Sequence, residues 1–383
     1  MDEVTLRRLA IRQFERGERP AEIWPRLGRS RRWFFKWLAR YRAAGPDALL
    51  GQSRAHHRHP RSTTPAVQAA IRAIREQHDD WGERTIAREL PAHIVGPTPG
   101  HTTVGQILRA AGQIGQRRSR TVPTIRYPRL VPAAALELVE HDFFGPRWIV
   151  GFGRVYGYQS MDVFSRSVCL GAEGSKASAT QLAYWVGLFQ RFGLPKVVQT
   201  DNEFGLTSTV MRGGFTRVTR LFLALGIEHR FIPEGEPYRN GHIERFNRTY
   251  RYAFYDQHVF ADLAHLQRRE AQYERYFNER RSHGGIGYAV PASRFPAERP
   301  RLDSEFALGD VDLDYRHLAA GQVTYVRRVD ADGEIAVNHE VVRLDPTLAG
   351  EYVTARIHTP ELELTVLTVD GEIVPALRTG GAR

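Results

Sequence analysis

Residues 238–251 read YRNGHIERFNRTYR, the stretch that does most to decide the fold of this chain. The spacing of its apolar residues predicts a long helix over residues 238–255. One face of that helix groups four polar side chains, Asn240, Glu244, Asn247 and Arg248. A single carboxylate on a helix is most often simply solvated, so a functional interpretation of Glu244 depends on partners elsewhere in the chain.

Two such partners precede the helix at the ends of predicted strands. Asp142 ends a strand in VEHDFFGP, and Asp201 follows another in VVQTDNEFG. The predicted elements are strands at 136–142, 148–157 and 159–170, a helix at 177–192, a strand at 196–200, a helix at 218–225, a strand at 228–231 and helices at 238–255 and from 262 to about 280. Three hairpin strands followed by this alternation are typical of an α/β ribonuclease H-like domain.

The first and fourth strands of such a sheet are neighbours, so Asp142, Asp201 and Glu244 are expected to converge. An aspartate at a strand end is more often a turn former or a helix cap. Converging carboxylates, however, repel one another unless a hard divalent cation binds them, and Mg²⁺ prefers oxygen ligands. Two such ions can stabilise the attacking and leaving oxygens of a phosphoryl transfer.

Three motifs resemble the integrase core of the DDE transposases and retroviral integrases. They are HDFFGP at 141–146, TDNEFG at 200–205 and YRNGHIERFNRTYR at 238–251. Residues 276–295, YFNERRSHGGIGYAVPASRF, resemble the segment that closes this core in bacterial insertion-sequence transposases. The resemblance covers residues 134–300 best. It implies a DDE-type insertion-sequence transposase with a retroviral-integrase-like catalytic core, that is, a polynucleotidyl transferase.

The resemblance also implies roles for the three carboxylates. Asp142, Asp201 and Glu244 would be the catalytic residues and would bind two Mg²⁺ ions, for which Mn²⁺ is a possible substitute. Water would first free a 3′ hydroxyl at the end of the element, and that hydroxyl would then attack target DNA. The 42 residues between Asp201 and Glu244 exceed the spacing of retroviral integrases. Glu234 and Glu236 lie nearer that spacing, in a proline-glycine loop, and are the alternatives for the third carboxylate.

The charge of the chain is unevenly distributed. Residues 1–130 sum to +14, residues 131–300 to +4 and residues 301–383 to −7, within a formal net charge of +11. Of the 54 basic residues, only three are lysines. An arginine-rich amino-terminal region indicates a polyanionic partner, and guanidinium groups suit phosphates and guanine edges. Double-stranded DNA is the expected partner, as terminal inverted repeats and as target.

The amino-terminal 50 residues predict a helix-turn-helix domain. Gly28, Arg29 and Ser30 form the predicted turn, and the third helix spans residues 31–44. Its apolar face predicts a core contact, and its basic face predicts DNA contacts through Arg31, Arg32, Lys36 and Arg40. An ordinary solvated face is the alternative interpretation of that basic stripe.

The remaining segments predict further domains and tethers. Residues 51–63 are expected to be a linker, which is favoured over a metal site at its three histidines, and residues 64–116 a second helix-turn-helix or winged-helix domain. A basic linker follows at 117–133. Residues 305–383 predict five short strands in a small SH3-like all-β barrel, whose acidic charge favours protein–protein or interdomain contacts. Further DNA contacts are predicted at Arg117, Arg118, Arg120, Arg239, Asn240 and Arg248.

Composition excludes several classes of protein. The single cysteine, Cys169, excludes a disulfide scaffold and a cysteine-rich zinc cluster. No apolar run approaches the length of a membrane span, and the amino terminus lacks a signal-peptide core. We therefore expect a bacterial cytoplasmic protein associated with the nucleoid, acting as a homodimer or tetramer without a membrane partner. The alternative functions are a catalytically retired DNA-binding regulator and a hydrolytic nuclease on a ribonuclease H-like fold.

Overall fold

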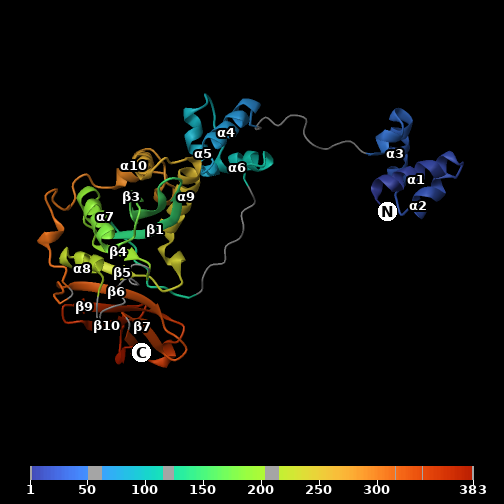
Figure 1. The fold of residues 1–383 in the computed structure, drawn as a ribbon. Coiled ribbons are helices and arrows are strands. Elements are labelled where there is room, and N and C mark those ends of the chain that lie inside the picture. The colour runs from blue at the N-terminus through green and yellow to red at the C-terminus, as the bar shows by residue number, and fades with distance from the viewer. Residues whose placement is uncertain are drawn as a thin grey trace. The chain divides into compact units, whose positions relative to one another are not determined.

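The computed structural model of the chain describes residues 2–50, 63–114, 125–202, 215–314, 316–338 and 340–381. Two compact units divide the chain, Met1–Thr64 and Pro65–Arg383 (Figure 1). Most of the predicted linker 51–63, with its histidines, lies outside the described residues. The predicted DNA contacts Arg117, Arg118 and Arg120 lie outside them as well.

The first unit has the predicted helix-turn-helix order. Its helices are α1 (Glu3–Glu15), α2 (Pro20–Arg26) and α3 (Arg31–Ala44), followed by a short 3₁₀ turn at Pro46–Leu50. Ser30 caps α3, since its hydroxyl accepts a hydrogen bond from the Trp33 backbone N–H at 3.2 Å. Gly28 has a φ of +63°, a left-handed conformation that glycine adopts readily in this tight turn. The apolar face of α3 is buried through Phe34, Trp37 and Leu38.

The second unit begins with a three-helix domain, α4 (Pro65–Gln77), α5 (Glu83–Glu89) and α6 (His101–Ala110). Its small core includes Ile71, Ile86, Val104 and Leu108. Polar contacts connect it to the segment that follows the last long helix. Asp80 forms an ion pair with Arg281, and Arg88 Nη1 donates to the Gly287 carbonyl at 3.2 Å. The predicted second helical DNA-binding domain is therefore present and packs on the α/β core.

A long mixed sheet lies at the centre of the second unit. Its strands are β1 (Leu138–Ile149), β2 (Gly153–Asp162), β3 (Val168–Glu173), β4 (Val197–Thr200), β5 (Glu228–Phe231), β6 (Gly321–Arg328), β9 (Tyr352–Thr359), β10 (Glu363–Leu367) and β11 (Ile373–Val374). Among the described residues their order is β11-β10-β9-β6-β5-β4-β1-β2-β3. β1, β2 and β3 pair antiparallel, while β1, β4 and β5 pair parallel. The α/β core with the predicted ribonuclease H-like strand order is confirmed.

The predicted positions of the first two turns were wrong. The first strand does not end at Asp142 but continues to Ile149, and β2 then runs from Gly153 to Asp162. The reason is visible at the glycines. Gly151 and Gly153 have φ values of +81° and +112° and form the turn. Gly157, expected near a turn, instead lies within β2, where a Cβ would approach Phe144 Cβ to 3.0 Å.

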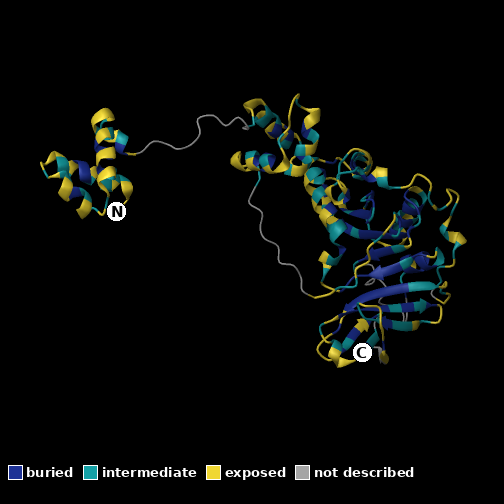
Figure 2. Ribbon diagram, turned by 180° about the vertical axis from the view of Figure 1, so that it is seen from behind, coloured by how far each residue is buried: buried dark blue, intermediate teal, exposed yellow. Residues whose placement is uncertain are grey.

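Helices cover both faces of the core part of the sheet. On one face lie α7 (Ser178–Arg191) and α8 (Arg217–Ala224), and on the other lie α9 (Gly241–Ala253) and α10 (Leu263–Glu279). Buried residues concentrate in the strands between these layers (Figure 2). Alternate residues of β1 therefore face different helices. His141 lies on the α7 side, as predicted, where its Nδ1 is 2.8 Å from Ser160 Oγ.

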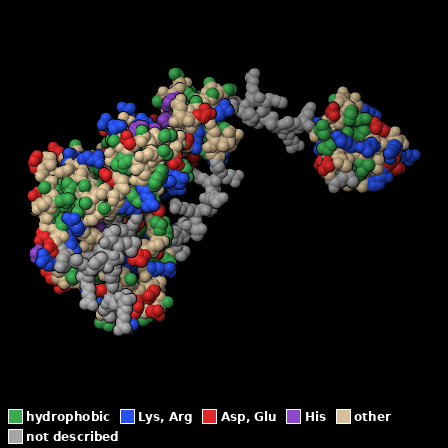
Figure 3. Space-filling view, viewed as in Figure 1, with side chains coloured by type: hydrophobic (Ala, Val, Ile, Leu, Met, Phe, Trp, Pro, Cys, Tyr) green, Lys and Arg blue, Asp and Glu red, His purple; other side chains and the backbone are tan. Residues whose placement is uncertain are grey.

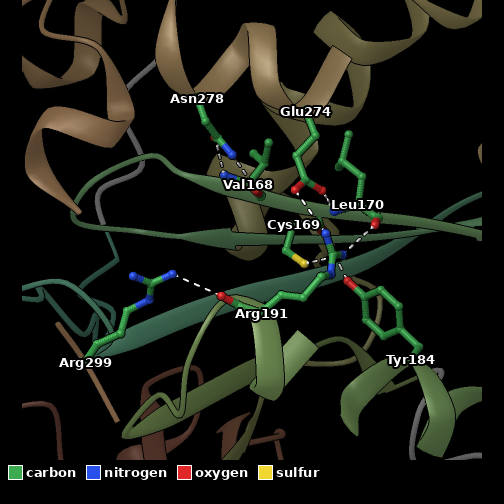
Figure 4. Close-up of polar contacts among 8 residues, drawn as sticks. All are labelled: Val168, Cys169, Leu170, Tyr184, Arg191, Glu274, Asn278 and Arg299. Carbon is green, nitrogen blue, oxygen red and sulfur yellow. Dashed lines mark hydrogen bonds and ion pairs between the residues drawn. The ribbon is translucent and has the colours of Figure 1, made fainter. Parts of the chain in front are cut away.

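Side chains from two helices protect the exposed edge of β3 (Figure 4). Asn278 accepts from the Val168 N–H and donates to its carbonyl, both at 2.8 Å. Glu274 accepts from the Leu170 N–H at 2.7 Å, and Arg191 donates to the Leu170 carbonyl at 3.3 Å. These bonds occupy backbone groups that would otherwise pair with another strand.

The carboxy-terminal segment contains the predicted strands, but a closed all-β barrel is not confirmed. β6 pairs in parallel with β5, so β6, β9, β10 and β11 extend the core sheet. The other strands, β7 (Glu334–Val337), β8 (Glu340–Arg343) and β12 (Leu377–Gly381), form a separate three-stranded sheet. The physical reason is that β5 would otherwise present an unpaired edge. The interdomain contact expected of this acidic segment is thus a shared sheet.

Glu270 on α10 predicts a pH dependence of stability. Its carboxylate is buried and accepts a hydrogen bond from the Tyr250 hydroxyl at 2.7 Å, and burial raises its pKa to about 8. The folded state then holds a proton that the unfolded state releases above its ordinary pKa. Stability from this group is complete below about pH 4.5 and declines as pH rises towards 8, by at most about 1.4 kcal/mol per pH unit.

We expect Glu270→Gln to flatten the fall in melting temperature of the second unit between about pH 5 and 8. Calorimetry at several pH values measures this directly. Glu279→Gln, at an exposed position on the same helix, is the matched control and should retain the wild-type slope. An unchanged slope in Glu270→Gln would show that Glu270 is ionised in the folded chain.

Candidate active site

Two of the three predicted carboxylates lie at the same level on neighbouring strands. β1 and β4 run parallel, with Glu140 opposite Gln199. Asp142 and Asp201 each follow two residues later, Asp142 within β1 and Asp201 directly after β4. Asp201 is followed by Asn202, whose side chain donates to the Ile232 carbonyl at 2.7 Å. The parallel register therefore brings the two aspartates to one edge region of the sheet.

The helix that contains Glu244 is attached to β1 by a buried carboxylate. Glu140 is 3% exposed and accepts from the backbone N–H groups of His242 at 3.0 Å and Ile243 at 2.9 Å. The His242 ring Nδ1 lies 2.8 Å from the other Glu140 oxygen. A carboxylate at a helix amino terminus satisfies N–H groups that have no intrahelical partner. Glu140 thus fixes the first turn of α9 over β1.

Asn240 provides a second attachment at the same place. Its side chain is 2% exposed, donates to the His141 carbonyl at 2.8 Å and accepts from Gln199 Nε2 at 3.3 Å. One amide therefore connects the start of α9 to β1 and to β4. The prediction of a DNA contact at Asn240 is not supported, because both polar ends of this buried side chain bind protein groups.

Glu244 and Asn247 lie one turn apart on α9. Asn247 Nδ2 donates to Asp142 Oδ2 at 2.7 Å, which connects the helix directly to the first aspartate. Partial burial raises the pKa of Glu244, as does the neighbouring Glu140, while Arg248 lowers it. A carboxyl whose proton is held more tightly by burial and by a like charge is what an incompletely neutralised acidic site produces.

The alternatives for the third carboxylate occupy other environments. Glu236 accepts hydrogen bonds from the Tyr352 hydroxyl at 2.6 Å and from Arg239 Nε at 2.9 Å, so protein groups hold it away from a catalytic role. The Glu234 side chain is 71% exposed and lies 3.8 Å from Arg327 Nη2. Neither lies on α9, whereas Glu244 shares that helix with the Asp142 partner Asn247.

Within the described ranges, no group of three or more His, Cys, Asp or Glu side chains lies close enough together to hold a metal ion. The donor chemistry nevertheless fits a hard divalent cation. Asn247 Oδ1 is buried without a hydrogen-bond partner among the described residues, although the same amide binds Asp142 through its nitrogen. An oxygen left in this state beside a carboxylate matches the ligands that Mg²⁺ prefers, directly or through water.

The basic residues predicted to bind DNA divide into exposed and enclosed groups. Arg31, Arg32 and Lys36 are exposed on α3, and Arg40 is partly exposed there. Figure 3 shows Lys and Arg side chains on the visible face of this first unit. Arg248 is exposed on α9. These positions are compatible with a nucleic-acid contact.

Arg239 is enclosed, in contrast to that prediction. Its side chain is 13% exposed, and its guanidinium lies 4.0 Å from the ring centre of Tyr127 and 4.7 Å from that of Tyr352. It also donates to Glu236. This arrangement joins the segment before β1 to strand β9, so Arg239 stabilises the fold, and a DNA contact there is not supported.

Sequence reasoning missed Glu140. The available signal was its position two residues before Asp142, because side chains two apart on a strand share a face. Other interpretations of single residues are confirmed. Asp162 holds the turn after β2, accepting from the Leu136 N–H at 2.8 Å and from the Ser165 N–H at 2.7 Å. Cys169 is buried and 1% exposed.

Comparisons with known proteins agree with the geometry. Residues 225–291, which include Glu244, match a model of the integrase core domain. Two homeodomain-like models match residues 1–50 and 33–108. The uncharacterized 39.2 kDa protein of insertion element IS476 from Xanthomonas euvesicatoria is 27% identical over 260 residues, 65% of this chain and 70% of that protein. The resemblance to insertion-sequence transposases with an integrase-like core is confirmed.

Further similarities concern the same integrase core. The uncharacterized 31.7 kDa protein of insertion element IS407 from Burkholderia multivorans is 26% identical over 219 residues, 56% of this chain and 76% of that protein. The HTLV-2 integrase catalytic core domain, solved in complex with magnesium, aligns at 12% identity over 43% of this chain and 99% of that chain, with a TM-score of 0.33. A simian T-cell lymphotropic virus intasome chain aligns over 82% of this chain and 100% of that chain, at 12% identity and a TM-score of 0.38. No helix in the described part of the transposase-like chain is long and apolar enough to span a membrane.

Proposed function

We propose that this chain is a DNA transposase that binds terminal inverted repeats and catalyses metal-dependent phosphodiester cleavage and 3′-hydroxyl strand transfer into target DNA. The observation that supports this most is the placement of three carboxylates around one strand end. Asp142 and Asp201 follow paired positions on parallel strands, and Glu244 lies one turn before Asn247, which binds Asp142. The arrangement is the donor set that phosphoryl transfer requires.

Asp142, Asp201 and Glu244 would hold two Mg²⁺ ions, with Mn²⁺ as a substitute. Bound Mg²⁺ supplies stabilisation of the charge that develops on the attacking and leaving oxygens. The chain itself supplies the positions of the ligands. Asn247 orients the Asp142 carboxylate, and Glu140 holds the amino-terminal turn of α9 so that Glu244 faces the same strand end.

Partners and location follow from the same proposal. The basic face of α3 and the three-helix domain α4–α6 would recognise the repeats, and Arg248 would contact the strand near the carboxylates. A transposase must hold two ends together, so the chain would act as a dimer or tetramer. Its place would be the bacterial cytoplasm, on the nucleoid where both DNA substrates lie.

One assay tests the proposed reaction. The full chain is mixed with Mg²⁺, supercoiled plasmid and a labelled duplex containing the inverted repeat read from DNA flanking the gene. Covalent joining of the label to plasmid is the expected result. Nicked or shortened DNA without joining would support a hydrolytic nuclease instead, and binding without either product would support a retired regulator.

The α3 contacts give a separate prediction. Because two phosphate contacts would be lost, Arg32→Ala combined with Lys36→Ala should lower affinity for the repeat about tenfold and reduce the slope of log K against log salt by about two. Arg12→Ala, an exposed arginine on α1, is the matched control. Fluorescence anisotropy over a salt series measures both quantities. An unchanged slope in the double variant would mean that α3 presents only a solvated face.

A further inference from the structure

A half-buried arginine in the turn between β2 and β3 lacks partners for part of its charge. Arg166 has a φ of +68°, a conformation uncommon for residues other than glycine. Its Nε and Nη1 atoms are buried, and no hydrogen-bond partner for them exists among the described residues. Unsatisfied buried donors on a charged group are costly to a fold, and strained backbone is often found at functional sites. Arg166 therefore calls for a functional explanation.

The surroundings of Arg166 form a defined concentration of positive charge beside α9. A Cβ placed on Gly285 would lie 3.4 Å from Arg166 Nε and 3.2 Å from His283 Nδ1, so both side chains pack on the loop after α10. Arg129 Nη2 lies 3.4 Å from His242 Nε2 at the start of α9. Arg129 is exposed, so it lies at the solvent side of this group.

The electrostatics agree with an excess of cations. Burial lowers the pKa of Arg166, and the nearby Arg129 and Arg245 lower it further, while Glu140 and Asp162 oppose them. Burial lowers the pKa of His283 to about 4, and Arg166, Arg281, Arg245 and His242 contribute to that shift. His283 is therefore neutral at pH 7 and can accept as well as donate a hydrogen bond.

The two carboxylates that face this cluster are committed elsewhere. Glu140 accepts the two N–H groups of α9 and lies against the His242 ring. Asp162 accepts from the Leu136 and Ser165 N–H groups. Arg281 has its own partner in Asp80. Three guanidinium groups, those of Arg129, Arg166 and Arg245, are thus left in excess over the available carboxylates.

We propose that Arg166, with Arg129 and Arg245 at its rim, binds a phosphate group of the DNA strand adjacent to the reacting phosphodiester. Guanidinium N–H groups that lack protein partners suit the oxygens of a phosphate. The location follows from α9, because Arg245 directly follows Glu244 and because Glu140 neighbours both Arg166 and Glu244. Binding there would fix the direction in which the strand crosses the carboxylates. That the phosphate belongs to DNA rests on the proposed function, whereas the anion site itself does not.

The first test uses inorganic phosphate as the probe and needs no catalysis. Melting of the full chain is followed without divalent cations, in sodium phosphate and in sodium chloride of equal ionic strength. Phosphate should raise the melting temperature of the wild-type second unit by about 2–4 °C at concentrations well above the dissociation constant. Arg166→Gln should lose most of that rise. Arg268→Gln, at an exposed position on α10, is the matched control and should keep it.

The behaviour of Arg166→Gln without phosphate separates binding from structure. A structural arginine would destabilise the fold when replaced, whereas removal of an unpaired half-buried charge should leave the melting temperature unchanged or raise it. Should Arg166→Gln fail to fold, Arg245→Gln provides the same test from an exposed position on α9. An equal phosphate-dependent rise in wild type and in both variants would overturn the proposal.

The second test identifies DNA as the source of the phosphate. Labelled ends that contain one uncharged methylphosphonate at successive positions are assayed for joining. Wild type should lose about tenfold at one position near the reacting bond, the effect of one lost charge-assisted contact. Arg166→Gln should lose about as much on unmodified DNA and nothing further at that position. Additional loss there in Arg166→Gln would contradict the assignment. Absence of joining by wild type would contradict the proposed function, while the melting result would still decide the anion site.

Discussion

Replacing Asp142 by Asn is expected to lower strand transfer by on the order of a thousandfold or more, because a metal-binding carboxylate contributes several kcal/mol of transition-state stabilisation. The same loss is expected for Asp201→Asn and Glu244→Gln. Each substitution preserves the size of the side chain and removes its charge. Binding to the repeat should be unchanged, since the basic face of α3 lies in the first unit.

Controls on α9 and its approach decide which acidic residues matter. Asp256→Asn removes a carboxylate that pairs with Arg251 just after α9, and it should retain full joining. Glu234→Gln tests the alternative third carboxylate and should retain it as well. Joining is measured with the labelled end and plasmid, and binding with the same duplex in Ca²⁺. Full joining by Glu244→Gln together with loss in Glu234→Gln would falsify the assignment of Glu244.

The second large effect is expected at Glu140. Substitution by Ala would leave the His242 and Ile243 N–H groups and the His242 ring without their acceptor in a buried place. We expect about 2–4 kcal/mol of local destabilisation. The amino-terminal turn of α9 would open, and joining should fall about a hundredfold because Glu244 loses its position. Glu140 acts through α9 in this account, as a positioning residue.

Hydrogen exchange distinguishes this role from direct catalysis. In Glu140→Ala the amides of residues 242 and 243 should exchange on the order of a hundredfold faster, the kinetic equivalent of the lost stability. Glu140→Gln keeps one acceptor oxygen and should recover much of the protection and of the joining activity. Exchange at Val168, whose amide binds Asn278 at the far edge of the sheet, serves as the internal reference. Lost joining with unchanged exchange would point to a direct role for Glu140 at the reacting atoms.

Local patterns were sufficient for most helices and for the order of the core strands. The periodicity of residues 31–44 and the glycine turn before them determine α3 without tertiary information. The turn between β1 and β2 was misplaced because Gly157 suggests a turn by composition. Its actual requirement is close packing against Phe144, a contact made by the neighbouring strand. Sequence patterns do not encode which glycine is needed for space and which for a positive φ.

The candidate site divides in the same way. Asp142, Asp201 and Glu244 were recognisable from the motifs around them. Asn240 and Arg239 belong to the same motif and were assigned to DNA, yet one is buried between β1 and β4 and the other between two tyrosines. Burial depends on what distant segments cover, and Tyr352 lies more than a hundred residues from Arg239. Arg166 was missed because an unpaired guanidinium is visible only when every possible partner has been placed.

The parallel pairing of β5 with β6 has a consequence for biosynthesis. Residues 228–231 can complete their hydrogen bonds only after residues 323–325 have left the ribosome, more than ninety positions later. Until then the nascent core exposes a bare strand edge, and Arg327 has not yet reached the Asn202 side chain beside Asp201. The region around the carboxylates is therefore assembled late in translation. A polypeptide interrupted before β6 would contain all three acidic residues and still lack the strand that secures them.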